Sequence, residues 1–101
     1  MPDLPAMLRI AMQAGRSNGR KKQMFYTYVL KLNNQDLYIG WTVDLVNRVK
    51  LHNTGKVDAT KSYLPAKLVY YEACLSREKA INREKQLKSG FGRAYLKRRL
   101  Y

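Results

Sequence analysis

The chain has a single cysteine, three prolines and no long apolar run among its 101 residues. Because Cys74 has no second cysteine to pair with, an intramolecular disulfide is excluded, which favours a reducing compartment. No stretch approaches the ~20 apolar residues that a membrane-spanning helix needs. The N-terminus also lacks the order of charge, apolar run and small-residue cleavage site that marks a signal peptide. We therefore expect a cytoplasmic protein with no membrane partner.

Acidic residues are also scarce. Seven Asp and Glu oppose twenty Lys and Arg, which gives a net charge of +13 and a pI near 10.1. Such an excess is typical of proteins that bind nucleic acid, because each neutralised phosphate releases a counterion and so drives binding. An anionic membrane or an acidic protein is the alternative. We expect DNA as the partner, with RNA and a targeting protein as further candidates.

Motifs of several common enzyme classes are missing as well. The chain has no CxxC pair, no glycine-rich loop for a nucleotide, no Ser-His-Asp ordering, no internal repeat and no low-complexity block. Its length predicts one domain with a modest core. Residues 1–23 hold turn formers and the basic tract Arg20-Lys21-Lys22, and we predict a flexible basic tail there. Residues 24–101 form the predicted folded domain.

The regular part of the chain predicts three strands and three helices. Aromatic and β-branched residues mark strands over 25–32, 37–41 and 68–74, and the polar residues 33–36 read as the turn of a hairpin. Thr42 reads as the N-cap of a helix that runs to about residue 53, and Ser76 as the cap of a second helix that ends near Ser89 and Gly90. A last helix is expected over 93–100. The predicted fold is a small α/β domain with a three-stranded antiparallel sheet flanked by helices.

Two helices place polar side chains beside apolar ones. Arg48 and His52 lie four residues apart and border the apolar arc of the first helix. Glu84 falls three residues after Ile81 and three before Leu87, on the inward stripe of the second helix. A carboxylate there must be paired, shift its pKa or bind a cation. The alternatives are an ion pair with Arg48 or a neighbouring lysine, and a metal site.

These residue types suit phosphodiester chemistry. One carboxylate, Glu84, can hold Mg²⁺ or Mn²⁺ if water and phosphate complete the shell. Arg48 offers a permanent cation for phosphate oxygens, and His52 a proton relay or phosphate contact. The strand tyrosines Tyr28 and Tyr38 would act as bases if a neighbouring arginine or metal lowered the pKa. Packing within the half-buried strands is the alternative for a chain with eight tyrosines.

The C-terminal quarter is strongly basic, with only Glu78 and Glu84 opposing many Lys and Arg between residues 77 and 99. A solvated helix face would explain it, but the excess is too large for pairing within the helix and favours a surface that follows phosphates. The residues we predict to bind nucleic acid are Lys50, Lys61, Arg83, Lys85, Lys88 and Arg93.

Taken together, Tyr26-Thr27-Tyr28, Tyr38-Ile39-Gly40, the downstream helix and Arg83-Glu84 resemble the GIY-YIG nuclease superfamily over residues 24–100. The chain is similar to its small stand-alone bacterial members, related to excision-repair endonuclease domains. The resemblance implies metal-dependent DNA cleavage. It assigns catalysis to Tyr28, Tyr38, Arg48 and His52, and the metal to Glu84.

Our first hypothesis is therefore a divalent-metal-dependent endonuclease that hydrolyses DNA, directed by substrate structure more than by sequence, in repair or recombination. The second is a non-catalytic module of the same fold that binds DNA or RNA. The third is an adaptor that recruits a nuclease or repair partner.

Overall fold

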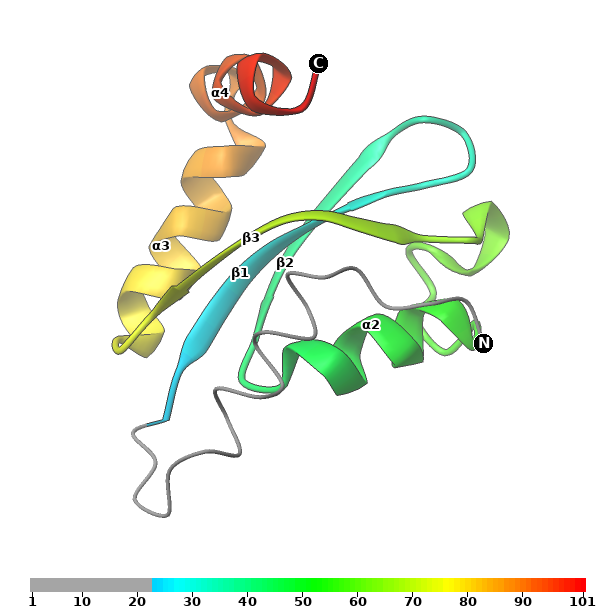
Figure 1. Ribbon diagram of the computed structural model, residues 1–101, viewed down its shortest axis with the longest axis horizontal. Helices are drawn as coiled ribbons and strands as arrows, with labels where there is room; N and C mark the ends of the chain where they lie inside the picture. Colours follow the sequence, from blue (N-terminus) through cyan, green and yellow to red (C-terminus); the bar gives the residue numbers. More distant parts are fainter. Residues whose placement is uncertain (1–22) are drawn as a thin grey trace.

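The computed structural model describes residues 23–101, which form a three-stranded sheet with helices on both faces (Figure 1). The elements in chain order are β1 (Phe25–Lys31), β2 (Leu37–Thr42), α2 (Leu45–Asn53), the short 3-10 helix η1 (Lys61–Tyr63), β3 (Lys67–Cys74), α3 (Arg77–Lys88) and α4 (Gly90–Leu100). The tail predicted over residues 1–23 lies outside the described residues, apart from Gln23. Among residues 23–101, no helix is both long and apolar enough to cross a bilayer.

The sheet has β1 at its centre, with strand order β2-β1-β3. Both neighbours run antiparallel to β1, as the sequence predicts. The register places Tyr28 of β1 opposite Gly40 of β2 and Tyr71 of β3. β2 is an edge strand, so its outer side is open to a partner or a ligand.

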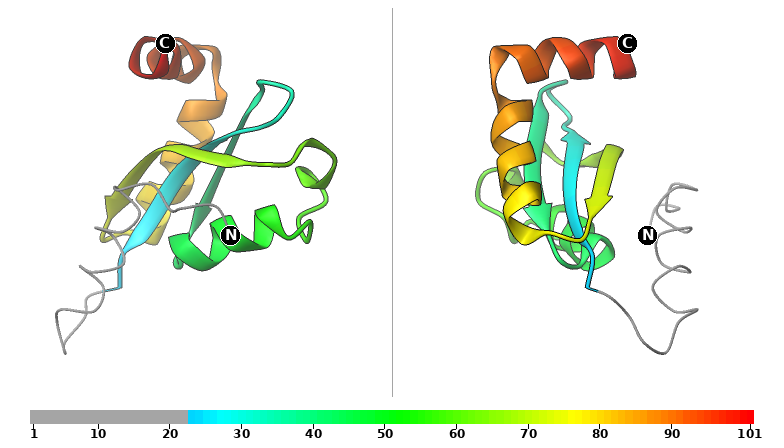
Figure 2. Two further views of the ribbon diagram at one scale, coloured as in Figure 1. Left: turned by 45° about the vertical axis from the view of Figure 1, so that its right-hand side comes forward. Right: turned by 90° about the vertical axis from the view of Figure 1, so that its left-hand side faces the viewer.

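The two faces of the sheet bury different side chains, as the period-two alternation of a strand requires. Tyr28 and Leu30 point to the face covered by α2, where they pack with Leu45 and Val49. Val29 points to the opposite face, covered by α3 and α4, where it packs with the helix residues Leu87 and Leu96 and with Ile39 of β2. Figure 2 shows the helices on either side of the sheet, with α4 lying across the end of the hairpin formed by β1 and β2.

The start of α2 differs from the expectation. Thr42 is the last residue of β2, and Asp44 is the N-cap, because its carboxylate accepts a hydrogen bond from the backbone N–H of Asn47. Thr42 instead accepts a hydrogen bond from the Asp44 backbone N–H through its hydroxyl and so fixes the turn before the helix. The end of α2 matches the expectation, since Gly55 follows the C-cap Thr54 with the positive φ of 76° that favours glycine.

The junction of α3 and α4 also differs. The sequence predicts that Gly90 ends the second helix, whereas it is the first residue of α4. Ser89 separates the two helices: it is the C-cap of α3, and its hydroxyl caps α4 by accepting from the Gly92 N–H. A Cβ on Gly92 would come within 2.1 Å of the Gln86 carbonyl oxygen. Glycine is therefore required where the two helices meet, and α4 begins earlier than the predicted Arg93.

Candidate active site

The hydroxyl of Tyr28 lies at the centre of a buried hydrogen-bond cluster. Tyr28 belongs to the central strand β1 and has no exposed surface. Arg48 Nε donates a hydrogen bond to the hydroxyl at 3.2 Å, and His52 Nε2 lies 3.0 Å from it. The spacing of Arg48 and His52 on α2 thus brings both side chains to one atom of β1. We call Tyr28, Arg48, His52 and Thr60 the buried cluster.

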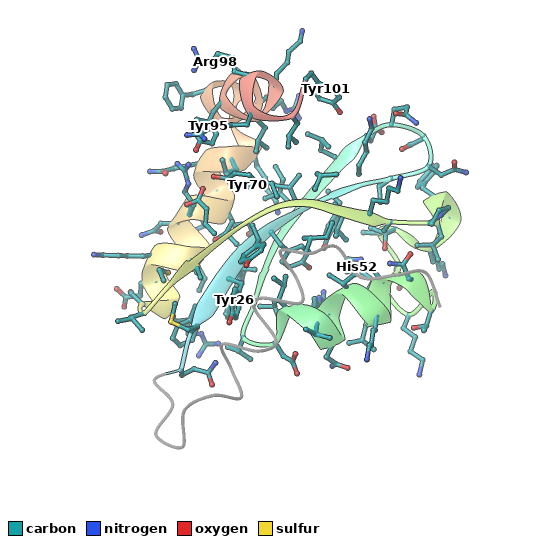
Figure 3. The ribbon with its side chains drawn as sticks, viewed as in Figure 1. Tyr26, His52, Tyr70, Tyr95, Arg98 and Tyr101 are labelled. Atoms are coloured by element: carbon teal, nitrogen blue, oxygen red, sulfur yellow. The ribbon has the colours of Figure 1, made fainter. Side chains whose placement is uncertain are left out.

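Thr60 completes the cluster from the loop before η1. His52 is fully buried, lies on the side of α2 that faces the sheet (Figure 3), and its Nδ1 lies 2.8 Å from the Thr60 hydroxyl. Arg48 can only donate, so the Tyr28 oxygen accepts from it, and the buried phenol proton is then satisfied only by donating to His52 Nε2. The imidazole therefore carries its proton on Nδ1 and donates to Thr60, whose hydroxyl donates to the Val57 carbonyl at 3.4 Å. The two hydroxyls and the ring N–H of this hydrogen-bonded series each have an acceptor.

His52 is neutral in this environment. Burial, together with the charge of Arg48, lowers the pKa of His52 from 6.5 to about 4. The sequence offered two roles, proton relay and phosphate contact. Full burial and hydrogen-bond partners on both ring nitrogens favour the first role, and the phosphate contact stays a prediction. His52 orients Tyr28, and through it Arg48.

The expectation that a neighbouring arginine lowers the pKa of the strand tyrosines holds for the contribution of Arg48 to Tyr28 but not for the net shift. Burial raises the pKa of Tyr28, and the opposing hydrogen bond and charge of Arg48 do not outweigh it. The phenol is also closed to solvent, so it has no access to an attacking water molecule. Tyr28 remains a protonated hydroxyl that holds Arg48 in place.

Tyr38 is the better placed of the two tyrosines for chemistry. It comes from the edge strand β2, is only partly buried, and its ring lies 4.9 Å from the His52 ring and 6.4 Å from the Tyr28 ring. The hydrogen bond to the Tyr28 hydroxyl raises the pKa of Arg48, and the Tyr38 hydroxyl adds to this effect. Arg48 is thus a fixed cation between one buried tyrosine and one that solvent reaches.

Gly40 makes room for the cluster. A Cβ at this position would lie 2.5 Å from the Tyr28 hydroxyl and 2.7 Å from its ring carbon Cζ. No real Cβ tolerates such distances, so the tyrosine could not keep its place over any other residue. The glycine of Tyr38-Ile39-Gly40 is needed for this close approach.

Glu84 lies on α3 with its side chain 18% exposed and its Oε1 3.5 Å from Lys88 Nζ. Of the alternatives that the sequence left open, the ion pair with a neighbouring lysine is present. The charge of Glu84 is one of the causes that raise the pKa of Tyr28, so the carboxylate lies within electrostatic range of the buried cluster. Arg48 on α2 and Glu84 on α3 therefore lie on opposite faces of the sheet, and both helices pack near the pair of strands β1 and β2.

The residues present fit one kind of metal site. Among residues 23–101, no three His, Cys, Asp or Glu side chains gather as a ligand set. Mg²⁺ and ions like it are nevertheless commonly bound through one or two carboxylates, with water and substrate phosphate at the remaining positions. Glu84, mostly buried but reached by solvent, suits such an ion as the single ligand from the chain.

The residues predicted to bind nucleic acid are spread over several elements. Lys50 on α2 and Lys85 on α3 are exposed. Lys61 is exposed and lies 3.4 Å from the Asp58 carboxylate, a weak surface pair. Lys88 and Arg93 line one groove, between β2 and the C-terminal helices.

Arg83 has a different environment from the other predicted phosphate contacts. Its Nε donates to both carboxylate oxygens of Glu72, at 3.1 and 2.9 Å, and its guanidinium lies 5.0 Å from the centre of the Tyr95 ring. Tyr70 also donates to Glu72, at 2.7 Å, and lies 3.1 Å from the Tyr95 hydroxyl. These contacts join β3, α3 and α4, so they give Arg83 a structural role.

Sequence reasoning missed two members of the site. Thr60 lies in a polar loop with no regular pattern, and its contact with His52 depends on how that loop folds back on α2. The sequence places Gly40 on the same strand face as Tyr38, which is the signal that could have indicated its packing against a tyrosine of the neighbouring strand.

A family model described as the GIY-YIG catalytic domain matches residues 24–98. The UPF0213 protein of Syntrophus aciditrophicus is 43% identical over 65 residues, which cover 62% of this chain and 75% of that protein. The UPF0213 protein of Haloquadratum walsbyi is 35% identical over 65 residues, covering 63% and 73%. The solution NMR structure of the UPF0213 protein of Bacillus halodurans is 32% identical, with a TM-score of 0.47, and the match covers 72% of this chain and 81% of that one.

The matched family defines the class of protein, a nuclease domain. The chain belongs to the GIY-YIG family, and the match spans nearly all of the residues that the structure describes. The matched span includes Tyr28, Tyr38, Arg48, His52 and Glu84.

Proposed function

We propose that the protein is a divalent-metal-dependent endonuclease that hydrolyses DNA phosphodiester bonds. Family membership supports the general class. The observation that carries the proposal is the buried Tyr28 hydroxyl. It accepts a hydrogen bond from Arg48 and is itself oriented by its hydrogen bond to neutral His52. Burying these polar groups costs more free energy than an apolar core would, so packing alone does not explain them. They do hold the partly exposed Arg48 guanidinium in one position, as binding of a phosphate oxygen requires.

Each residue then has a distinct role in hydrolysis. Arg48 binds a non-bridging oxygen of the scissile phosphate and stabilises the charge that develops there. Tyr38, beside it and partly exposed, acts as its phenolate: its oxygen accepts a hydrogen bond from the attacking water and takes the proton of that water, which returns the neutral phenol. Glu84 holds Mg²⁺ or Mn²⁺, which when bound polarises the phosphodiester and stabilises the leaving oxygen. Water is the nucleophile, so no covalent enzyme intermediate forms.

The charge of the chain supports a substrate chosen by shape. Lys and Arg contacts to phosphates are the same for every base sequence. A net charge of +13 on 101 residues therefore favours low sequence specificity, with the structure of the DNA directing cleavage. We place such an activity in DNA repair or recombination.

One observation favours a second candidate, a module of the same fold that binds DNA or RNA without cutting it. Glu84 already has a counterion in Lys88. If that pair persisted in the complex, the carboxylate would have no role beyond local charge balance.

Cleavage of a DNA panel distinguishes the two. Supercoiled plasmid, single strand, flap, nicked duplex and Holliday-type junction are incubated with Mg²⁺, Mn²⁺ or EDTA, with wild-type protein and with Glu84→Gln purified identically. Metal-dependent cutting that the variant lacks supports the endonuclease and names its substrate structure. Tight binding without cutting under every condition supports the binding module.

A further inference from the structure

A groove of about 670 Å³ runs between the beginning of the edge strand β2 and the helices α3 and α4. In the right-hand view of Figure 2, this is the region where α4 passes across the end of the hairpin of β1 and β2. The residues that line it are Gln35, Asp36, Leu37, Tyr38, Ile39, Lys88, Arg93, Leu96, Lys97 and Tyr101.

The groove is positively charged. Lys88, Arg93 and Lys97 oppose one carboxylate, Asp36, which accepts a hydrogen bond from the Asn34 amide at 3.1 Å. Arg93 and Lys97 lie four apart on α4, where two like charges slightly destabilise a helix. Within residues 23–101, neither side chain has an ion-pair or hydrogen-bond partner. Their placement lacks a structural explanation and suits an anionic ligand.

Apart from Gln35, the remaining lining is apolar and aromatic. Leu37 and Ile39 line it from β2 and Leu96 from α4, and Tyr101 lines it as well, with the Lys31 amine 5.0 Å from its ring centre. A small free anion would leave this surface uncovered. A polymer that alternates phosphates with less polar sugar groups would meet both the cations and the apolar lining.

The groove shares one residue with the candidate active site and adjoins it at a second. Tyr38, the proposed base, is one of its lining residues. Lys88 lines it too, and the same amine lies 3.5 Å from the Glu84 carboxylate. A strand whose scissile phosphate lay beside Tyr38 would therefore have the groove as a neighbouring surface.

We propose that this groove binds the sugar–phosphate backbone of the substrate strand on one side of the scissile phosphate, with Arg93 and Lys97 as phosphate contacts. The proposal rests on the proposed function, because it takes nucleic acid as the ligand. It adds Lys97 to the residues predicted to contact phosphate. It also has the bound strand run from Tyr38 along α4, whichever end of the strand leads.

The test is the salt dependence of DNA binding, measured in EDTA so that no strand is cut. Fluorescence anisotropy of a short labelled duplex gives the slope of log affinity against log salt concentration, whose magnitude is about 0.9 for each phosphate that the protein neutralises. The groove variant is Arg93→Gln/Lys97→Gln. The control variant, Lys79→Gln/Arg98→Gln, also removes two exposed cations, one from α3 and one from α4, and neither residue lines the groove; Figure 3 labels Arg98.

We expect the magnitude of the slope to fall by about two for the groove variant and by much less for the control. Equal slopes for the groove variant and wild type, or equal reductions in both variants, would overturn the proposal. Circular dichroism of each variant checks that α4 is retained. The single variant Lys97→Gln, whose slope should fall by about one, serves if the double variant misfolds.

The same proteins, assayed for cleavage with metal, separate this proposal from the proposed function. Wild type that cuts DNA while the groove variant keeps the wild-type slope contradicts the groove alone. Wild type that never cuts, with a groove variant whose slope falls by about two, contradicts the endonuclease and leaves the groove as a nucleic-acid site.

Discussion

Tyr28 and Gly40 face each other across β1 and β2, and the tyrosine hydroxyl occupies the space that any side chain on Gly40 would fill. This contact joins two parts of the sequence signature in one place. The glycine lets the phenol lie flat against β2, and the phenol in turn presents its oxygen to Arg48 and His52. The position of the Arg48 guanidinium thus depends on Gly40, a residue that has no side chain.

Gly40→Ala should therefore lower the free energy of unfolding by about 1–3 kcal/mol, as overpacking of a tight core does. Gly90→Ala is the matched control, since nothing lies within 4 Å of the added carbon there. We expect its effect to stay below about 1 kcal/mol. Urea denaturation followed by circular dichroism measures both. Equal stability of the two variants would contradict the close approach.

Tyr28→Phe should mainly lower stability, whereas Tyr38→Phe should mainly lower the cleavage rate. Removing the buried Tyr28 hydroxyl leaves Arg48 Nε and His52 Nε2 without a partner, so the free energy of unfolding should fall by about 1–3 kcal/mol, with lower cleavage as Arg48 loses its place. Removing the Tyr38 hydroxyl should cost less than about 1 kcal/mol but slow cleavage about 100-fold or more. Denaturation and single-turnover cleavage, run on both variants, check the assignment. A Tyr38→Phe protein that cuts at the wild-type rate would exclude Tyr38 as the base.

Burial of neutral His52 makes stability depend on pH. Its pKa is about 4 when folded and 6.5 when exposed, so between these values the unfolded chain binds more protons. Stability is then full above pH 6.5 and declines as the pH falls toward 4. From about pH 7 to about pH 5 the loss should be about 2 kcal/mol. His52 is the only histidine, so His52→Gln should remove most of this slope in urea denaturation. An unchanged slope would mean that folding does not lower the pKa of His52.

Arg83 and Lys85 lie two residues apart on α3 and should behave differently. Arg83→Gln breaks the partly exposed pair with Glu72 and the contact with Tyr95, so we expect a loss of about 0.5–1 kcal/mol in unfolding free energy and an unchanged salt slope of DNA binding. Lys85→Gln, on an exposed position, should leave stability within about 0.5 kcal/mol and reduce the slope by about one. A reduced salt slope for Arg83→Gln with unchanged stability would instead assign Arg83 to DNA binding.

Most of the fold could be predicted because its elements are marked locally. The predicted ends of the three strands lie within one residue of the observed ends, since aromatic and β-branched runs are bounded by turn residues. The prediction that Ser76 caps α3 is confirmed, because its hydroxyl accepts from the Lys79 N–H. The errors lie where one residue type is common in two structural positions. Thr42 can end a strand as well as cap a helix, and Gly90 can start a helix as well as stop one.

The site could be predicted less completely, because its properties come from burial. The spacing of Arg48 and His52 indicated a shared direction, and the structure brings both to Tyr28. Nothing in the sequence shows that the Tyr28 oxygen is closed to water, which reverses the expected direction of its pKa shift. Thr60 was missed for the same reason, since its contact with His52 exists only once the loop has folded.

The most direct test of the account is nicking of supercoiled plasmid in Mg²⁺ by wild type, Glu84→Gln and Glu78→Gln, with DNA affinity measured on the same samples. Glu78 is an exposed carboxylate on the same helix, which makes it the matched control. We expect wild type and Glu78→Gln to nick at similar rates. Glu84→Gln should not nick at all while binding DNA within about twofold of wild type, a difference of less than about 0.5 kcal/mol. Nicking by Glu84→Gln at the wild-type rate would contradict the central claim that this carboxylate serves a metal-dependent nuclease.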